Sequence, residues 1–164
     1  MIKAPDVKSY QVLSAHVLLG QAAMLTGNAQ EAIQHYRVVV DGNPTNTVAM
    51  NNLAYLLSEN ADKTDEALKY AQRAKELQPD RADITDTLGW ILFRKGVYDQ
   101  AIGYLQEAAN KDRSALYKYH LGIACWKAGK REHGREVLAA ALRQDPNLPE
   151  ARLANEALGG MPAK

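Results

Sequence analysis

Three sets of residues recur along this chain at nearly the same spacing. In the first set, separated by 34, 35 and 33 residues, a small residue follows a leucine: Gly20, Ala54, Gly89 and Gly122. The second set is separated by 35, 34 and 33 residues: Ala32, Ala67, Ala101 and Gly134. The third set is Pro44, Pro79 and Pro146, with Arg113 where a further proline would fall. A repeat of this length predicts small units that bury their apolar surfaces against their neighbours.

Each unit contains two segments with apolar residues at helical spacing. In the third unit, Ile84, Leu88 and Ile91 mark the first segment, and Ala101 and Leu105 lie on the second. Glycines separate the two segments in three units, where a positive φ ends a helix at little cost: Gly27, Gly96 and Gly129. The second unit lacks this glycine and has one extra residue in its turn, SENADKTDEA, so we expect a looser corner there.

The recurring small residues have a physical reason in such a hairpin. Where two helices cross closely, a larger side chain would overpack the contact. The prolines suit the start of a following helix, which their fixed φ favours. The pattern therefore predicts an all-α protein built of helical hairpins.

Composition excludes several classes of function. Apolar residues make up 46% of the chain and charged residues 24%, which is typical of a folded protein. The formal charge of +1 predicts no electrostatic attraction to nucleic acid or anionic lipid. No run of 18 apolar residues exists, so we expect no direct membrane insertion. The single cysteine, Cys125, allows no internal disulfide, and its apolar neighbours predict a buried small side chain.

A 34-residue hairpin with Leu-Gly at positions 7 and 8, Ala at 20 and Pro at 32 resembles the tetratricopeptide repeat. The resemblance covers residues 13–46, 47–81, 82–114 and 115–148, over four-fifths of the chain. Residues 1–12 are then a lead-in, residues 149–158 resemble the helix that closes such arrays, and residues 159–164 form a flexible tail. The tryptophan common at position 4 is absent, replaced by His16, Met50, Thr85 and Lys118. The resemblance implies a right-handed α-solenoid whose first helices line a concave groove.

The family's groove positions, carried onto this chain, predict a peptide-binding site. Its residues are Gln21, Asn51, Asn52, Tyr55, Asp86, Trp90, Tyr119, His120 and Ile123. Aromatic rings in such a groove would supply large contact area at little entropic cost, unless they only pack between helices. The two asparagines could pair with the backbone of an extended peptide, although a helix start near Asn46 could also explain them.

Other chemistry is not indicated. The four histidines lie in different predicted helices without a metal-binding pattern, and there is no phosphate-binding loop or nucleophile elbow, so we expect no enzyme, metal or cofactor. Some proteins of this family bind acidic chaperone tails through a clamp of lysine, arginine and asparagine. This chain has Asp83 and Thr87 at the two basic positions, which argues against that ligand.

The sequence therefore predicts a non-catalytic scaffold that binds a peptide or protein segment in its groove. The alternative is a self-assembling structural oligomer, because the N-terminal face near Val12 and Leu13 is less clearly covered than the C-terminal one. The chain also resembles bacterial repeat proteins of cell-envelope and exopolysaccharide export systems. Taken alone, the chain carries no secretory signal and would be cytoplasmic; as a fragment of such a protein, it would be periplasmic or membrane-anchored.

Overall fold

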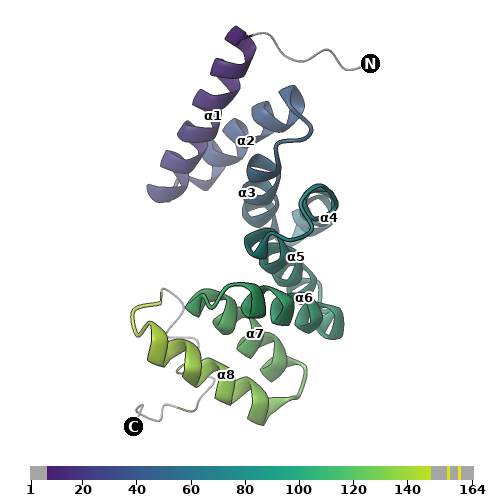
Figure 1. The fold of residues 1–164 in the computed structure, drawn as a ribbon, viewed down its shortest axis with the longest axis vertical. Coiled ribbons are helices and arrows are strands. Elements are labelled where there is room, and N and C mark those ends of the chain that lie inside the picture. Colours follow the sequence, from purple (N-terminus) through teal and green to yellow (C-terminus); the bar gives the residue numbers. More distant parts are fainter. Residues whose placement is uncertain (1–6, 149–154, 156–158, 160–164) are drawn as a thin grey trace. The chain divides into compact units, whose positions relative to one another are not determined.

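The computed structural model describes residues 7–148, together with residues 155 and 159, and these form helices without any strand (Figure 1). The α-helices are α1 (Val7–Leu25), α2 (Ala29–Gly42), α3 (Thr47–Ser58), α4 (Thr64–Leu77), α5 (Ala82–Arg94), α6 (Tyr98–Lys111), α7 (Ala115–Lys127) and α8 (Arg131–Gln144). A short 3-10 helix, η1 (Ala61–Lys63), precedes α4. The prediction of an all-α protein made of paired helices is confirmed.

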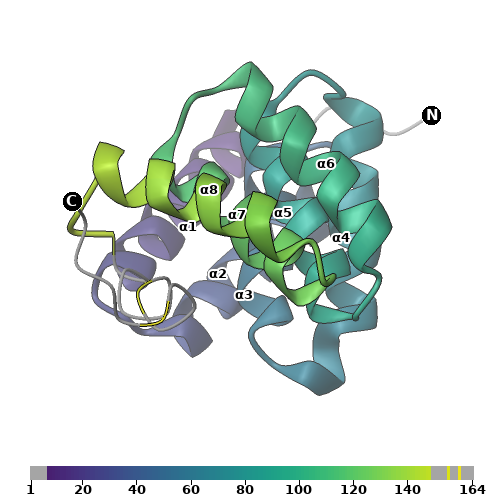
Figure 2. The same cartoon turned by 90° about the horizontal axis from the view of Figure 1, so that it is seen from below.

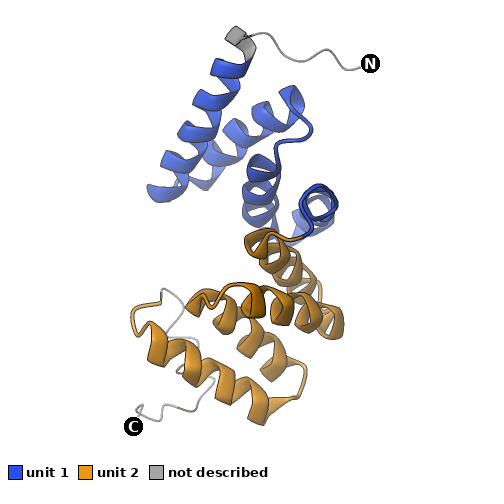
Figure 3. Cartoon of the chain, viewed as in Figure 1, with its two compact units in different colours: residues 1–79 blue, residues 80–164 orange. Residues whose placement is uncertain are grey.

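The chain divides into two compact units, residues 1–79 and residues 80–164 (Figure 3). Each unit contains two hairpins, and the paired helices run side by side in both views (Figures 1 and 2). Within unit 1, α3 packs on α2, and within unit 2, α7 packs on α6. The first helix of each unit's second hairpin therefore rests on the second helix of the hairpin before it. The right-handed superhelix stays a prediction.

Three helices begin at residues where a repeat was predicted to begin. The helices α3, α5 and α7 begin at Thr47, Ala82 and Ala115, the residues at which repeats two to four were placed. The first helix begins earlier, at Val7, inside the predicted lead-in. The predicted closing helix, 149–158, lies outside the described residues except for Asn155, and so does the predicted tail except for Gly159.

Glycines end the first helix of three hairpins as predicted. The φ angles of Gly27, Gly96 and Gly129 are 75°, 77° and 84°, in the left-handed region that glycine adopts without strain. In each case the second helix starts within two residues of the glycine. These three turns are confirmed as positive-φ helix ends.

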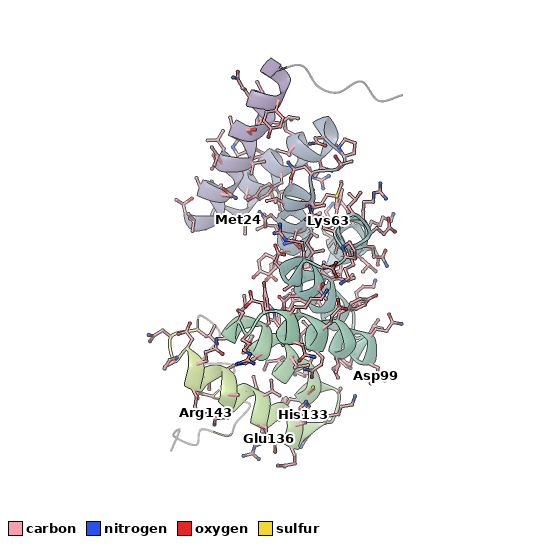
Figure 4. The ribbon with its side chains drawn as sticks, in the orientation of Figure 1. Met24, Lys63, Asp99, His133, Glu136 and Arg143 are labelled. Carbon is pink, nitrogen blue, oxygen red and sulfur yellow. The ribbon has the colours of Figure 1, made fainter. Side chains whose placement is uncertain are left out.

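The corner of the second hairpin has no glycine, and the looser turn expected there stays a prediction. Its extra residue is taken up by η1, and the side-chain oxygen of Asn60 accepts a hydrogen bond from the backbone N–H of Asp62 at 3.0 Å. The Thr64 hydroxyl donates to the carbonyl of Ala61 at 2.9 Å. Side-chain hydrogen bonds thus close this corner, which Lys63 marks in Figure 4, in place of a glycine.

Small residues lie where the two helices of a hairpin approach most closely. A Cβ at Gly89 would lie 2.8 Å from Cγ of Leu105, and one at Gly122 would lie 2.7 Å from Cγ of Leu138. Since Cβ atoms essentially never approach other atoms so closely, even a methyl group at either position would require the facing leucine to shift. The prediction that the small register marks helix crossings is confirmed.

Cys125 is fully buried in α7, as its apolar neighbours predicted. Burial raises the pKa of its thiol, while Lys130 lowers it by a smaller amount. Within the ranges described above, no helix combines the length and the apolar character needed to cross a lipid bilayer.

Candidate peptide-binding site

An acid–histidine pair connects the two hairpins of unit 2. Asp86 lies on α5 and His120 on α7, and both side chains are buried. The Nδ1 atom of His120 lies 2.8 Å from Oδ2 and 3.0 Å from Oδ1 of Asp86, so its N–H donates to the carboxylate. The pair is nearly closed to solvent, since the side chain of His120 is 4% exposed and that of Asp86 is 7% exposed.

Aromatic rings stack on this histidine. The Trp90 indole lies with its ring centroid 4.1 Å from that of His120, and the two planes differ by 22°. Trp90 also stacks on Phe93, at 4.8 Å and 21°, and Phe93 in turn meets Tyr98 at a tilt. Trp90 and Phe93 are only partly buried. We call the partly exposed rings of Trp90 and Phe93, together with the buried pair Asp86 and His120, the α5–α7 face.

Two other predicted site residues belong to the core behind this face. Tyr119 and Ile123 are buried and pack with Leu138 and Ala141 of α8. Trp90 and Phe93 lie against this same cluster. The rings of the α5–α7 face are therefore supported by a packed core, which holds Trp90 in place.

Carboxylates lie near the first turns of α5 and α7, and their negative charges affect the pKa of Tyr117. Burial, followed by the negative charges of Asp86, Asp83 and Asp112, raises the pKa of the Tyr117 hydroxyl to about 12, against a smaller opposing effect of Arg81. A tyrosine in an unfolded chain ionises near pH 10. The folded protein therefore keeps this proton at a pH at which the unfolded chain loses it.

This difference predicts a loss of stability in alkali. The native state binds more protons than the unfolded state between about pH 10 and pH 12, so stability should fall as the pH rises through that window. Urea denaturation at a series of pH values would measure the slope. The Tyr117→Phe variant should show a shallower decline than the wild type, and equal slopes would contradict the assignment.

The carboxylates that were predicted to repel an acidic ligand are paired with basic side chains in the structure. Arg81 binds Asp83 through two hydrogen bonds, Nε to Oδ1 at 2.8 Å and NH2 to Oδ2 at 2.5 Å. The bond from Arg81 lowers the pKa of Asp83. Since Asp86 is likewise bonded to His120, each carboxylate at this end of α5 has a basic partner. The exclusion of chaperone tails stays a prediction.

Unit 1 contains the other predicted site residues. Asn51 is buried on α3, and its side-chain oxygen has no hydrogen-bond partner among the described residues. Asn52 donates through Nδ2 to the hydroxyl of Tyr36 at 3.0 Å, which explains its orientation. Tyr55 is partly buried, and Gln21 is exposed on α1.

The start of α3 does not explain the paired asparagines. Asn46 caps this helix by accepting a hydrogen bond from the backbone N–H of Ala49 at 3.0 Å. Asn51 and Asn52 lie beyond the first turn, where asparagine lowers helix stability. Asn52 is accounted for by Tyr36, whereas the side-chain oxygen of the buried Asn51 is left without a hydrogen-bond partner among the described residues.

The structure thus brings together Asp86, Trp90 and His120 in unit 2, with Tyr119 and Ile123 behind them. Asp86 and His120 were predicted to line the same groove, but the hydrogen bond between them was not predicted. The two residues are offset by one position, because Asp86 lies three residues before Gly89 and His120 lies two before Gly122. The signal was that groove positions of successive first helices come close together. Among the residues described, no group of three or more His, Cys, Asp or Glu side chains could hold a metal ion.

Paired helices, small residues at the crossings and positive-φ turns define a helical-repeat protein built of hairpins. The family model for the tetratricopeptide repeat matches residues 7–47, 51–115 and 87–149. The chain therefore belongs to the tetratricopeptide repeat family.

Two bacterial relatives are similar to the chain in sequence. The repeat-containing protein PA4667 of Pseudomonas aeruginosa is 34% identical over 86 residues, covering 52% of this chain and 15% of PA4667. YpiA of Bacillus subtilis is 28% identical over 141 residues, covering 85% of this chain and 33% of YpiA. The chain thus spans a third or less of the length of these relatives.

Solved structures share the fold. TTC0263 of Thermus thermophilus has a TM-score of 0.76 at 18% identity, covering 92% of this chain and 84% of TTC0263. YrrB, described as a repeat protein with an unusual peptide-binding site, has a TM-score of 0.68 at 22% identity. That match covers 92% of this chain and 76% of YrrB. At these identities the likeness concerns the fold alone.

Proposed function

We propose that this chain is a non-catalytic scaffold that binds a peptide segment against the α5–α7 face. Tetratricopeptide repeat proteins are in general protein-interaction scaffolds, and YrrB is one whose description names a peptide-binding site. The observation that carries the proposal is Trp90, a partly exposed indole stacked on His120 and Phe93. The stack fixes the ring before binding, so little side-chain entropy is lost when an apolar anchor of the peptide packs on it.

Polar groups of each unit support this proposal. In unit 2, the Asp86 carboxylate fixes the orientation of the His120 ring on which Trp90 stacks. Among its described residues, unit 1 has an unpaired acceptor of its own, the Asn51 oxygen, which a separate contact with a partner N–H would satisfy; a buried acceptor without a partner costs about 1–3 kcal/mol. The ligand class is an extended segment with an apolar or aromatic side chain.

The two tryptophans of the chain allow a direct test. Peptides selected on the wild-type protein from a phage-displayed library would be titrated against the single-tryptophan variants Trp126→Phe and Trp90→Phe. With Trp90 as the remaining fluorophore, binding should shift the emission to shorter wavelength, because the ring loses water. With Trp126 alone, the emission should stay nearly unchanged.

Affinity provides the second measurement. Trp90→Ala should weaken peptide binding at least about tenfold, the cost of losing a hot-spot ring, while Trp126→Ala serves as the matched control. Because Trp90 packs on two rings and on the unit 2 core, its removal should also lower the melting temperature. Peptides that bind Trp90→Ala as tightly as the wild type would overturn the proposal.

The pathway is a separate hypothesis. The resemblance to bacterial export-system proteins suggests a partner in a cell-envelope or exopolysaccharide export complex. Copurification of such components with the wild-type protein, and their loss with Asn51→Ala and Trp90→Ala, would support it.

A further inference from the structure

One face of α1 exposes an unusual concentration of apolar side chains. Of the large apolar side chains that are exposed in the described part of the chain, Val38 and Val97 stand alone on α2 and before α6. The others all lie on α1: Tyr10, Val12, Leu18, Leu19 and Leu25. Ala15 and Ala22 are exposed on the same helix. We call the surface formed by Val12, Ala15, Leu18, Leu19, Ala22 and Leu25 the outer face of α1.

The internal repeat shows that this face is suited to a neighbouring helix. Leu19 is 49% exposed, whereas the leucines at the same register of α3 and α7, Leu53 and Leu121, are buried. In those hairpins the preceding helix, α2 or α6, packs on the first helix. On α1 the equivalent surface is exposed among the described residues.

The charge pattern restricts what can cover the outer face. Residues 9–30 contain no Asp, Glu, Lys or Arg. A charged partner surface would lose hydration there and find no opposite charge, whereas an apolar surface pays no such cost. Within the described residues, the outer face of α1 is itself the surface where such side chains gather, and two copies of it carry no like charges that would repel.

The order of large and small residues fits an antiparallel pair. Val12, Ala15, Leu19 and Ala22 recur at intervals of three and four residues, the spacing of a helix–helix seam. In an antiparallel arrangement, Val12 lies opposite Ala22 of the second copy, and Leu19 lies opposite Ala15. Every large side chain on this seam then faces a small one, which allows the two helices to interdigitate.

We propose that the outer face of α1 binds the same face of a second copy of the chain, as an antiparallel helix pair about a twofold axis. Such a contact is isologous and closes at the dimer, without growth into filaments. The dimer should therefore depend on protein concentration. It uses no residue of the α5–α7 face.

Sedimentation velocity over a concentration series tests the stoichiometry. The wild type should pass from monomer to dimer, Leu19→Lys and Leu18→Lys should remain monomeric, and Val38→Lys, at a similarly exposed helix position, should dimerise normally. Circular dichroism would confirm that each variant is folded. A wild type that stays monomeric, assemblies larger than a dimer, or dimers unaffected by both lysine variants would each overturn the proposal.

Cross-linking tests the orientation. In a Cys125→Ala background, a mixture of Ala15→Cys and Leu19→Cys proteins should form a disulfide-linked dimer faster than either protein alone, because the two positions lie opposite each other only in the antiparallel pair. Faster cross-linking of each single variant with itself would indicate a parallel pair and contradict the proposed geometry.

Discussion

Replacing Gly134 by alanine is expected to destabilise the protein by about 2 kcal/mol, with a fall in melting temperature of about 4–8 °C. A Cβ at this position would lie 2.7 Å from the backbone nitrogen of Trp126 and 2.8 Å from the carbonyl oxygen of Gly122. Gly134 lies on α8, and these two atoms belong to the backbone of α7. Backbone atoms of a helix cannot move to another rotamer as the end of a side chain can. The two helices would have to separate, at a cost that exceeds the better helix propensity of alanine.

Gly103→Ala is the matched control for this substitution. Gly103 also lies inside a helix, α6, but a Cβ there would meet nothing within 4 Å. Alanine should therefore stabilise the protein by about 0.5–1 kcal/mol, because it loses less backbone entropy on folding than glycine does. Chemical denaturation of both variants would give shifts of opposite sign, and shifts of the same sign would show that helix packing is not the cause.

The second large effect is expected at the acid–histidine pair of unit 2. Asp86→Ala should lower the free energy of unfolding by about 3 kcal/mol, because it leaves the buried His120 without its partner. Asp86→Asn keeps an acceptor oxygen and loses the charge, so its effect should be smaller. A double-mutant cycle with His120→Ala, measured by urea denaturation, would isolate the interaction itself from the loss of either side chain.

Asp83→Ala is the control for burial. Its side chain is 39% exposed, against 7% for Asp86, and its ion pair with Arg81 is solvated. Its loss should cost less than about 1 kcal/mol. Because Arg81 lowers the pKa of Asp83, this contribution is present above the carboxyl's ordinary pKa and disappears as the pH falls. Similar losses for Asp83→Ala and Asp86→Ala would contradict the role given to burial.

Much of the fold was readable from the sequence because its signals are local. The turn glycines depend only on backbone conformation, and Gly27, Gly96 and Gly129 all adopt the predicted positive φ. The small register at Gly89 and Gly122 depends on packing within one hairpin, whose two helices are close in sequence. Features of this kind can be predicted from the sequence without knowing how the hairpins pack on one another.

The corner of the second hairpin shows what the local signal left out. A turn without glycine suggested looseness, but Asn60 and Thr64 supply hydrogen bonds that close it. Asparagine and threonine can replace a positive-φ glycine in this way, since their side chains bond to nearby backbone groups. Composition alone does not reveal which of these bonds will form.

The geometry of the candidate site depends on contacts between hairpins, and these could not be predicted from the sequence. Asp86 and His120 were placed on one groove by analogy, whereas their hydrogen bond follows from how α7 packs beside α5. The burial of Tyr119 likewise depends on α8, which covers its ring. Binding roles for the predicted site residues stay predictions.

Within each unit, the packing of helices against their neighbours in chain order also bears on how the polypeptide acquires its structure. Most contacts join segments that are close in sequence, so folding needs only short loop closures, which cost little entropy and favour rapid folding. A hairpin leaving the ribosome could bury its own seam before the next hairpin is synthesised. A chain organised in this way can gain or lose whole hairpins during evolution while those that remain keep their internal contacts.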